Sequence, residues 1–186
     1  MKKIIIILMV LMLCGCSNSV AITEPKEIWL ATDIHYMSEL MHNNTDVFTT
    51  LMESSDGKLS EYSDDIFDSF LNTVIENKPD ALVLAGDLSF NGENFNLIEI
   101  AAKLAVVEEQ GIPVLVIPGN HDIEYPYAYV FIDEKVYTTQ QITEQEFKEL
   151  CGDYGYNEAI SKDESSFSYV YALSDNLWLM FIDTIQ

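Results

Sequence analysis

Basic side chains are scarce in this sequence. Lysine and arginine together number 9, aspartate and glutamate number 31, and the formal net charge is −22. A nucleic-acid-binding surface needs a basic footprint, so we expect no nucleic acid partner. The same charge argues against an anionic substrate drawn in by the overall field, unless bound divalent cations reverse the local sign. The simplest interpretation of the acidity is a well-solvated surface.

Cysteine is also rare, and two of the three cysteines lie near the start of the chain. Residues 1–13 consist of a start with two lysines and an apolar run, too short and wrongly flanked for an ordinary membrane-spanning helix. The stretch Leu13-Cys14-Gly15-Cys16 resembles a bacterial lipobox, with Cys16 as the lipidated residue. A plain secretory signal with incidental cysteines is the alternative. We therefore expect residues 1–16 to be a lipoprotein signal and residues 17–26 a tether.

This interpretation predicts an exported protein, anchored by lipid to the extracytoplasmic side of a bacterial membrane. Only Cys151 then remains, so no intramolecular disulfide is available despite the oxidising compartment. We expect Cys151 to be a small buried hydrophobic residue near a helix end. The remainder of the chain, residues 27–186, suits one domain with a sizeable core.

Three apolar stretches each end in side chains that can bind metal or move protons. Residues 114–117 form an unbroken apolar run typical of a strand buried on both faces, and residues 28–32 and 80–85 are similar. The residues that follow these runs are Asp33 and His35, then Gly86 and Asp87, then Asn120, His121 and Asp122. Ligands bind outside the carboxyl ends of strands in open α/β sheets. An aspartate after one strand is often only a helix cap, but three such ends in one chain indicate a site.

These blocks, Asp-x-His, Gly-Asp and Gly-Asn-His-Asp, resemble the calcineurin-like metallophosphoesterases over roughly residues 27–186. The resemblance implies a layered α/β fold and a dinuclear metal site that hydrolyses phosphate monoesters or diesters. Two divalent ions can neutralise the ester's charge and supply a hydroxide nucleophile. Carboxylate, amide and imidazole ligands suit Mn, Fe or Zn.

The resemblance also implies roles for individual residues. Asp33 and His35 would bind one metal, and Asn120 would bind the second through its amide oxygen. Asp87, on the central strand end, is our candidate for the bridging ligand. His121 would be the catalytic residue, acting near the leaving group as an acid or electrostatic aid, a role that suits an imidazole near neutral pH. Asp122 is expected either to orient His121 or to cap the next stretch of backbone.

Between and after these blocks the pattern predicts further elements. Residues 63–77 and 96–110 carry apolar stripes at helical spacing, with Ser63 as a candidate cap, so the unit is βαβαβ with a parallel sheet. We expect a short helix at residues 145–151 and two strands at residues 167–173 and 177–183.

Two irregular stretches have open interpretations. Residues 36–60 lack clear periodicity, and they are either a substrate lid, with His42 as a phosphate contact, or an ordinary surface excursion. The aromatic residues 125–131 either line the mouth of the site or form a packed loop.

Histidine is the third scarcity, and it separates this sequence from the family pattern. Its three histidines are His35, His42 and His121, whereas the family has further histidine ligands after the last strands predicted here. We therefore expect the domain at residues 27–186 to be C-terminally incomplete. One hypothesis is the N-terminal part of a lipid-anchored phosphoesterase; the other is a non-catalytic acidic surface lipoprotein that keeps only part of the metal site. The substrate stays open under the first hypothesis.

Overall fold

The computed structural model of the chain describes residues 24–43, 46–54 and 59–185. A parallel sheet lies at its centre, built from β1 (Ile28–Ala31), β2 (Ala81–Ala85) and β3 (Val114–Ile117) in the order β1-β2-β3. The registers align Leu30 with Val83 and Val83 with Leu115. The carboxyl ends of the three strands therefore meet at one edge of the sheet, as the sequence predicts.

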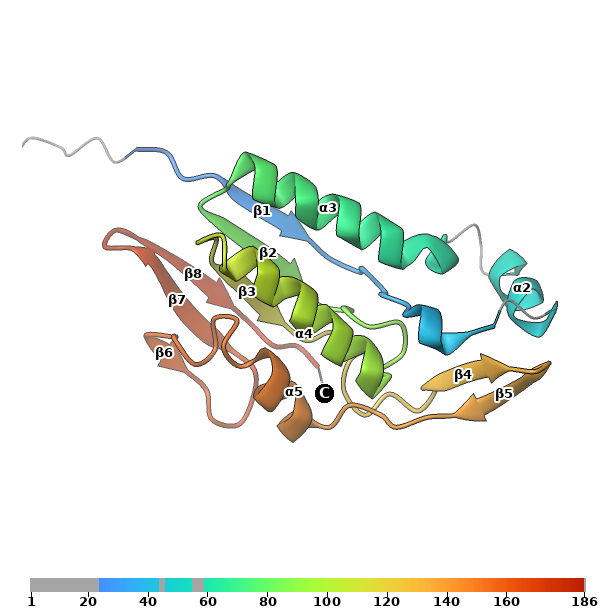
Figure 1. Cartoon of the computed structure of the whole chain (residues 1–186). Helices are drawn as coiled ribbons and strands as arrows, with labels where there is room; N and C mark the ends of the chain where they lie inside the picture. The colour runs from blue at the N-terminus through green and yellow to red at the C-terminus, as the bar shows by residue number, and fades with distance from the viewer. Residues whose placement is uncertain (1–23, 44–45, 55–58, 186) are drawn as a thin grey trace, which may run out of the picture.

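Two long helices cover one face of this sheet (Figure 1): α3 (Ser63–Asn77) and α4 (Asn94–Glu108). Both bury their apolar stripes in the main core, where Leu82 and Leu84 of β2 are fully buried with Leu97 and Leu104 of α4. Each such side chain stabilises the fold by roughly 1.5–3 kcal/mol relative to an exposed position. The mixed α/β class with parallel strands and covering helices is confirmed.

The predicted cap of α3 is wrong. Tyr62 occupies the N-cap position and no side chain caps it, whereas Ser63 is the first helical residue. The Ser63 hydroxyl instead accepts a hydrogen bond of 2.8 Å from the backbone N–H of Met37. Ser63 therefore connects the helix to the segment that follows β1.

Residues 36–60 contain more regular structure than their sequence indicates. They include the short helices η1 (Glu39–Met41) and α2 (Asp46–Glu53), and η2 (Ser60–Tyr62) follows. A second apolar cluster forms here from Met37, Met41, Phe48, Met52 and Phe131. Because Phe131 comes from a distant part of the chain, the periodicity of residues 36–60 alone does not reveal this cluster.

Phe131 belongs to a hairpin that was not predicted, β4 (Tyr129–Ile132) with β5 (Lys135–Thr138). The Glu134 carboxylate at its turn accepts hydrogen bonds from the backbone N–H groups of Asp46 and Val47, at 3.3 and 3.2 Å. An anionic acceptor suits the start of α2, where helix N–H groups lack partners. Figure 1 shows α2 and this hairpin at the end of the molecule toward which the parallel strands point.

The last part of the chain forms α5 (Glu144–Cys151) and an antiparallel sheet of β6 (Ser161–Lys162), β7 (Tyr169–Ser174) and β8 (Leu177–Phe181). The helix starts with a capping box between Thr143 and Glu146. Cys151 is buried at the end of α5, as predicted, and burial raises the pKa of its thiol. The Tyr169 hydroxyl donates to the Val116 carbonyl at 2.9 Å and so attaches this sheet to β3.

The predicted lipobox and its Cys16 lie outside the described residues. Within the part of the chain that is described, no helix combines the length and apolar character needed to cross a bilayer.

Candidate metal centre

Three of the predicted ligands converge at the ends of β1 and β2. Asp33, His35 and Asp87 each present one ligand atom, and these atoms all lie within 4.8 Å of one another. The carboxylate and imidazole donors match the preferences of Mn, Fe or Zn. The residues present therefore fit a divalent metal ion.

Backbone geometry brings these side chains together. Asp33, His35 and Asp87 have φ angles of +55°, +46° and +48°, a region that non-glycine residues rarely adopt. Hydrogen bonds from the Asp33 N–H to the Gly86 carbonyl and from the His35 N–H to the Asp87 carbonyl keep the two strand ends paired at 3.1 and 3.0 Å. Residues 33 and 35 converge only if the chain turns after β1, and their two positive φ angles form that turn, while Asp87 turns in the same way after β2. Such strain concentrates at functional sites.

The block after β3 packs tightly against Asp87. Gly119 leaves no room for a side chain, because an ideal Cβ there would stand 2.2 Å from the Asp87 backbone nitrogen. The backbone N–H of His121 donates to Asp87 Oδ1 at 2.9 Å. One oxygen of Asp87 thus has a protein partner, and this bond holds the carboxylate in place.

Asn120 shares a cavity with two of the converging ligands. This strand-tip cavity has a volume of about 310 Å³, and its walls come from the ends of β1, β2 and β3 and from residues just after β8. Asp33, Asp87 and Asn120 all line it. The structure therefore brings together residues from all three predicted blocks.

The imidazoles of His35 and His121 lie edge to face, with ring centroids 4.9 Å apart. Both Nδ1 atoms approach the backbone carbonyl of Phe90, at 3.4 Å from His35 and 3.2 Å from His121. His121 Nδ1 is also 3.0 Å from Oδ1 of Asn91. Carbonyl oxygens only accept, so Nδ1 is the protonated nitrogen and Nε2 is left for chemistry on each neutral ring.

In His35, the Nε2 atom faces Asp87, another of the three converging ligands. Its Nε2 atom is 3.9 Å from Asp87 Oδ2. A carbonyl behind the far nitrogen of a ligating imidazole is the usual way in which proteins orient such a ring. This geometry suits His35 as a ligand.

His121 also stacks on Tyr125, with ring centroids 4.2 Å apart and planes at 25°. Tyr125 belongs to the aromatic stretch for which the sequence left a site mouth and a packed loop open, and this one side chain lies at the site. Phe90 and Asn91 were missed altogether. They belong to none of the three blocks, and a backbone carbonyl carries no sequence signal.

Asp122 is completely buried and mainly accepts hydrogen bonds from backbone N–H groups. Its carboxylate accepts from the N–H groups of Leu88, Ser89 and Gly119 and from the Ser89 hydroxyl, at 2.8–3.0 Å. Burial raises the pKa of this carboxyl, and the four donors offset part of the increase. The ring of His121 is oriented instead by Phe90 and Asn91. Asp122 joins the loop after β2 to the turn after β3.

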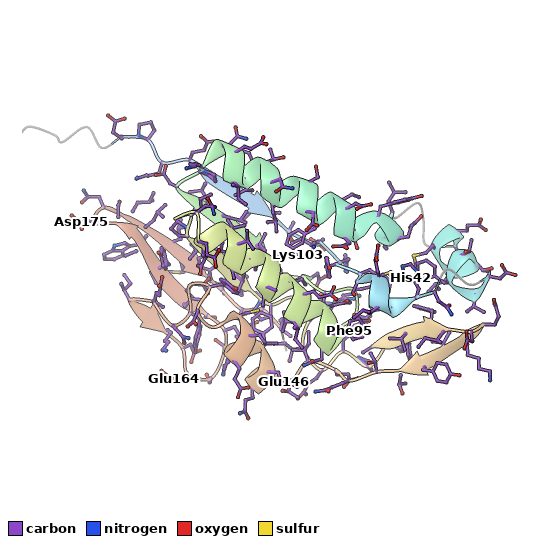
Figure 2. The ribbon with its side chains drawn as sticks, in the orientation of Figure 1. His42, Phe95, Lys103, Glu146, Glu164 and Asp175 are labelled. Carbon is purple, nitrogen blue, oxygen red and sulfur yellow. The ribbon has the colours of Figure 1, made fainter. Side chains whose placement is uncertain are left out.

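His42 lies in a different environment. Its ring stacks on Phe48 at 3.8 Å with planes 5° apart, and its backbone bridges to Phe131. Figure 2 shows His42 beside α2. It is absent from the residues that line the strand-tip cavity, so its role as a phosphate contact stays a prediction.

Comparison with known proteins agrees with this geometry. A family model described as calcineurin-like phosphoesterase matches residues 26–184. The DNA double-strand break repair protein Mre11 of Aeropyrum pernix is 39% identical over 70 residues, which cover 34% of this chain and 17% of that protein. The chain thus spans about a sixth of the length of this relative.

Proposed function

Because the chain belongs to the calcineurin-like phosphoesterase family, we propose that it contributes the metal-binding end of a hydrolase that cleaves phosphate esters with two divalent ions. The observation that carries this proposal is the convergence of ligand atoms from Asp33, His35 and Asp87 within 4.8 Å, with Asn120 on the cavity that Asp33 and Asp87 also line. The family implies metal-dependent phosphoester hydrolysis. The two-metal arrangement and the roles of single residues are our proposals.

In this proposal Asp33 and His35 hold one ion, Asp87 is shared, and Asn120 serves the second ion. Ions bound in this way would neutralise the phosphoryl charge and lower the pKa of an attacking water. Asp87 suits the shared position because it lies just beyond the end of β2, the central strand of the sheet. Its Oδ1 atom is held by the His121 N–H at 2.9 Å, which fixes the direction of the carboxylate.

His121 serves the leaving group. Its Nδ1 donates to the Phe90 carbonyl, so a protonated ring has its second proton on Nε2. That proton can pass to the alkoxide oxygen as the ester bond breaks, and the neutral ring then takes a proton from water. Tyr125 stacked on one face and Asn91 at Nδ1 keep the ring in a single orientation.

We further propose that the protein acts outside the cytoplasm, held to the bacterial membrane through Cys16. The lipobox-like stretch at residues 13–16 supports this. The charge of −22 favours a substrate other than nucleic acid. The DNA repair function in the name of the Aeropyrum pernix relative belongs to that protein, of which this chain matches only 17%.

The experiment combines metal binding with hydrolysis. Isothermal titration with Mn²⁺ should show binding to the parent chain, and Asp87→Asn should weaken it by about tenfold or more, because an anionic ligand is lost. Asp175→Asn is the matched control, since it removes the same charge from the exposed turn between β7 and β8. Equal Mn²⁺ affinity for the parent chain and for Asp87→Asn would contradict the proposal.

Hydrolysis of p-nitrophenyl phosphate and its bis-ester is the second measurement. We expect slow Mn²⁺-dependent turnover by the 186-residue chain, because only three histidines are present in it. Fast turnover that Asp87→Asn abolishes would show that these ligands suffice alone, and would overturn the expectation that further imidazoles are needed.

A further inference from the structure

We propose that an apolar pocket between β1 and α3 binds the organic group of the phosphoester substrate, and that this group is uncharged and apolar, such as an aryl or branched alkyl group. The inference rests on the proposed function. The pocket has a volume of about 540 Å³, within the range of about 300–1,000 Å³ typical of small-molecule sites. Its apolar walls are Ala31, Ile34, Leu59, Ile66, Phe67 and Phe70.

The pocket adjoins the cluster of proposed metal ligands Asp33, His35 and Asp87. Asp33 lines both this pocket and the strand-tip cavity, and His35 lines the pocket as well. A phosphoryl group bound at the cluster therefore lies at the boundary between a polar cavity and an apolar one. The polar cavity suits the metals and phosphate oxygens, and the apolar pocket can receive the group on the ester oxygen.

The lining determines the chemistry of that group. The chain carries 31 aspartates and glutamates, yet among the described residues that line the pocket Asp33 is the one carboxylate, and no lysine or arginine is present. Among these described lining residues, a second phosphate or another anion would find no lysine or arginine to pair with. Two serines, Ser60 and Ser63, also line the pocket, and the hydroxyl of Ser63 already accepts a hydrogen bond from the Met37 N–H at 2.8 Å. An uncharged apolar group fits this lining best, since its transfer from water is favourable without polar partners.

The mouth of the pocket presents apolar side chains to solvent. Ile66 on α3 is 53% exposed and Leu59 is 60% exposed, whereas Phe67 is buried at 2%. A bound aryl group would cover Ile66 and Leu59. Ile98 on α4 is 49% exposed and is not among the lining residues. Ile66→Asp and Ile98→Asp therefore form a matched pair at similarly exposed helix positions.

Trp29 offers a local reporter. Its ring centroid lies 6.5 Å from that of Phe70, which lines the pocket. The second tryptophan, Trp178, is 63% exposed on β8. A Trp178→Phe background leaves Trp29 as the single tryptophan of the chain, which has two in total.

The first measurement isolates the pocket from the metals. Trp29 fluorescence is followed while the uncharged probe 4-tert-butylbenzyl alcohol is added in the presence of EDTA. We expect a saturable change, weakened about tenfold or more by Ile66→Asp because an apolar contact is replaced by a charge. Ile98→Asp should leave the affinity unchanged. Absence of saturable binding, or equal weakening by both variants, would overturn the inference.

The second measurement joins the pocket to the cluster with compounds that cannot be hydrolysed. With Mn²⁺ present, 4-tert-butylbenzylphosphonate should bind about tenfold more tightly than methylphosphonate, and Ile66→Asp should remove this preference. Asp87→Asn should weaken binding of both phosphonates and leave the neutral alcohol unaffected. A retained preference in Ile66→Asp would contradict the inference.

The two possible failures are distinguishable. Loss of alcohol binding together with intact Mn²⁺-dependent binding of methylphosphonate would reject the apolar pocket and leave the proposed function standing. Alcohol binding without any Mn²⁺-dependent phosphonate binding would reject the proposed function, and with it the assignment of the pocket to a phosphoester substrate.

Discussion

Gly119 lies so close to Asp87 that a Cβ atom at position 119 would stand 2.2 Å from Oδ1 of the Asp87 carboxylate. The glycine of the third block therefore leaves space for the ligand of the second block. The close approach also allows the His121 N–H to reach the same oxygen at 2.9 Å. The spacing between Gly119 and His121 thus contributes directly to the geometry of the proposed bridging ligand.

Replacing Gly119 by alanine should displace Asp87. We expect Mn²⁺ affinity to fall about tenfold or more and the free energy of unfolding to fall by about 2 kcal/mol, because the added methyl group must push backbone and carboxylate apart. Isothermal titration and urea denaturation measure the two effects. Gly111→Ala is the control: its φ is +80°, and its Cβ would meet nothing within 4 Å. Gly111→Ala should lower the free energy of unfolding and leave Mn²⁺ affinity unchanged. Unchanged Mn²⁺ affinity in Gly119→Ala would be evidence against the packing argument.

Asn91 should act as a positioning residue for His121. Asn91→Ala removes the side-chain oxygen 3.0 Å from Nδ1, so we expect kcat to fall by roughly tenfold with little change in KM, a fraction of the ~10²–10⁴-fold that general acid catalysis supplies. Nitrogen NMR of the His121 ring should show a mixture of tautomers in the variant. Asn176→Ala, in the exposed turn between β7 and β8, should change neither measurement. A single unaltered tautomer in Asn91→Ala would show that the Phe90 carbonyl suffices.

Asp122 should stabilise the fold more than any exposed carboxylate. Asp122→Asn replaces an acceptor of four hydrogen bonds with an amide whose nitrogen meets N–H donors. We expect a loss of about 2–4 kcal/mol in the free energy of unfolding, because charged hydrogen bonds are removed and buried donors lose partners. Asp163→Asn alters an exposed carboxylate that also accepts from a backbone N–H and two hydroxyls, and should cost much less. Equal losses, measured by urea denaturation, would refute this account.

Glu93 should make stability depend on pH. Its side chain is fully buried, and burial raises its pKa from 4.5 to about 7. The folded protein then keeps a proton that the unfolded chain releases, so this contribution is complete below pH 4.5 and is lost as the pH rises through about 7.

Glu93→Gln stays neutral and should escape that loss. The free energy of unfolding of the variant, relative to the parent, should rise by up to about 3 kcal/mol between mildly acidic and mildly alkaline pH. Urea denaturation over this pH range provides the measurement. Glu76→Gln, at an exposed position on α3, is the control: its free energy of unfolding relative to the parent should not change with pH. A flat difference for Glu93→Gln as well would mean that the carboxyl ionises normally in the folded state.

Local patterns accounted for the elements that lie near the site. The apolar runs before Asp33, Asp87 and Asn120 indicated parallel strands, and the stripes at residues 63–77 and 96–110 indicated covering helices. Residues 36–60 and 125–138 were harder, because the apolar side chains of α2 pack on Phe131, which is far away in the sequence. A short segment whose apolar side chains pack on a residue far away in the sequence shows no clear hydrophobic periodicity by itself.

The order of residues by itself determined which donors stand at the strand ends, because a buried strand and the polar residue after it are neighbours in the chain. The fold alone decided that three positive φ angles turn Asp33, His35 and Asp87 toward one point, that one carbonyl of Phe90 serves two imidazoles, and that Asp122 supports the backbone. These relationships join segments more than thirty residues apart. They depend on how the loops bring the strand ends together, and that arrangement results from packing of the whole sheet and its helices.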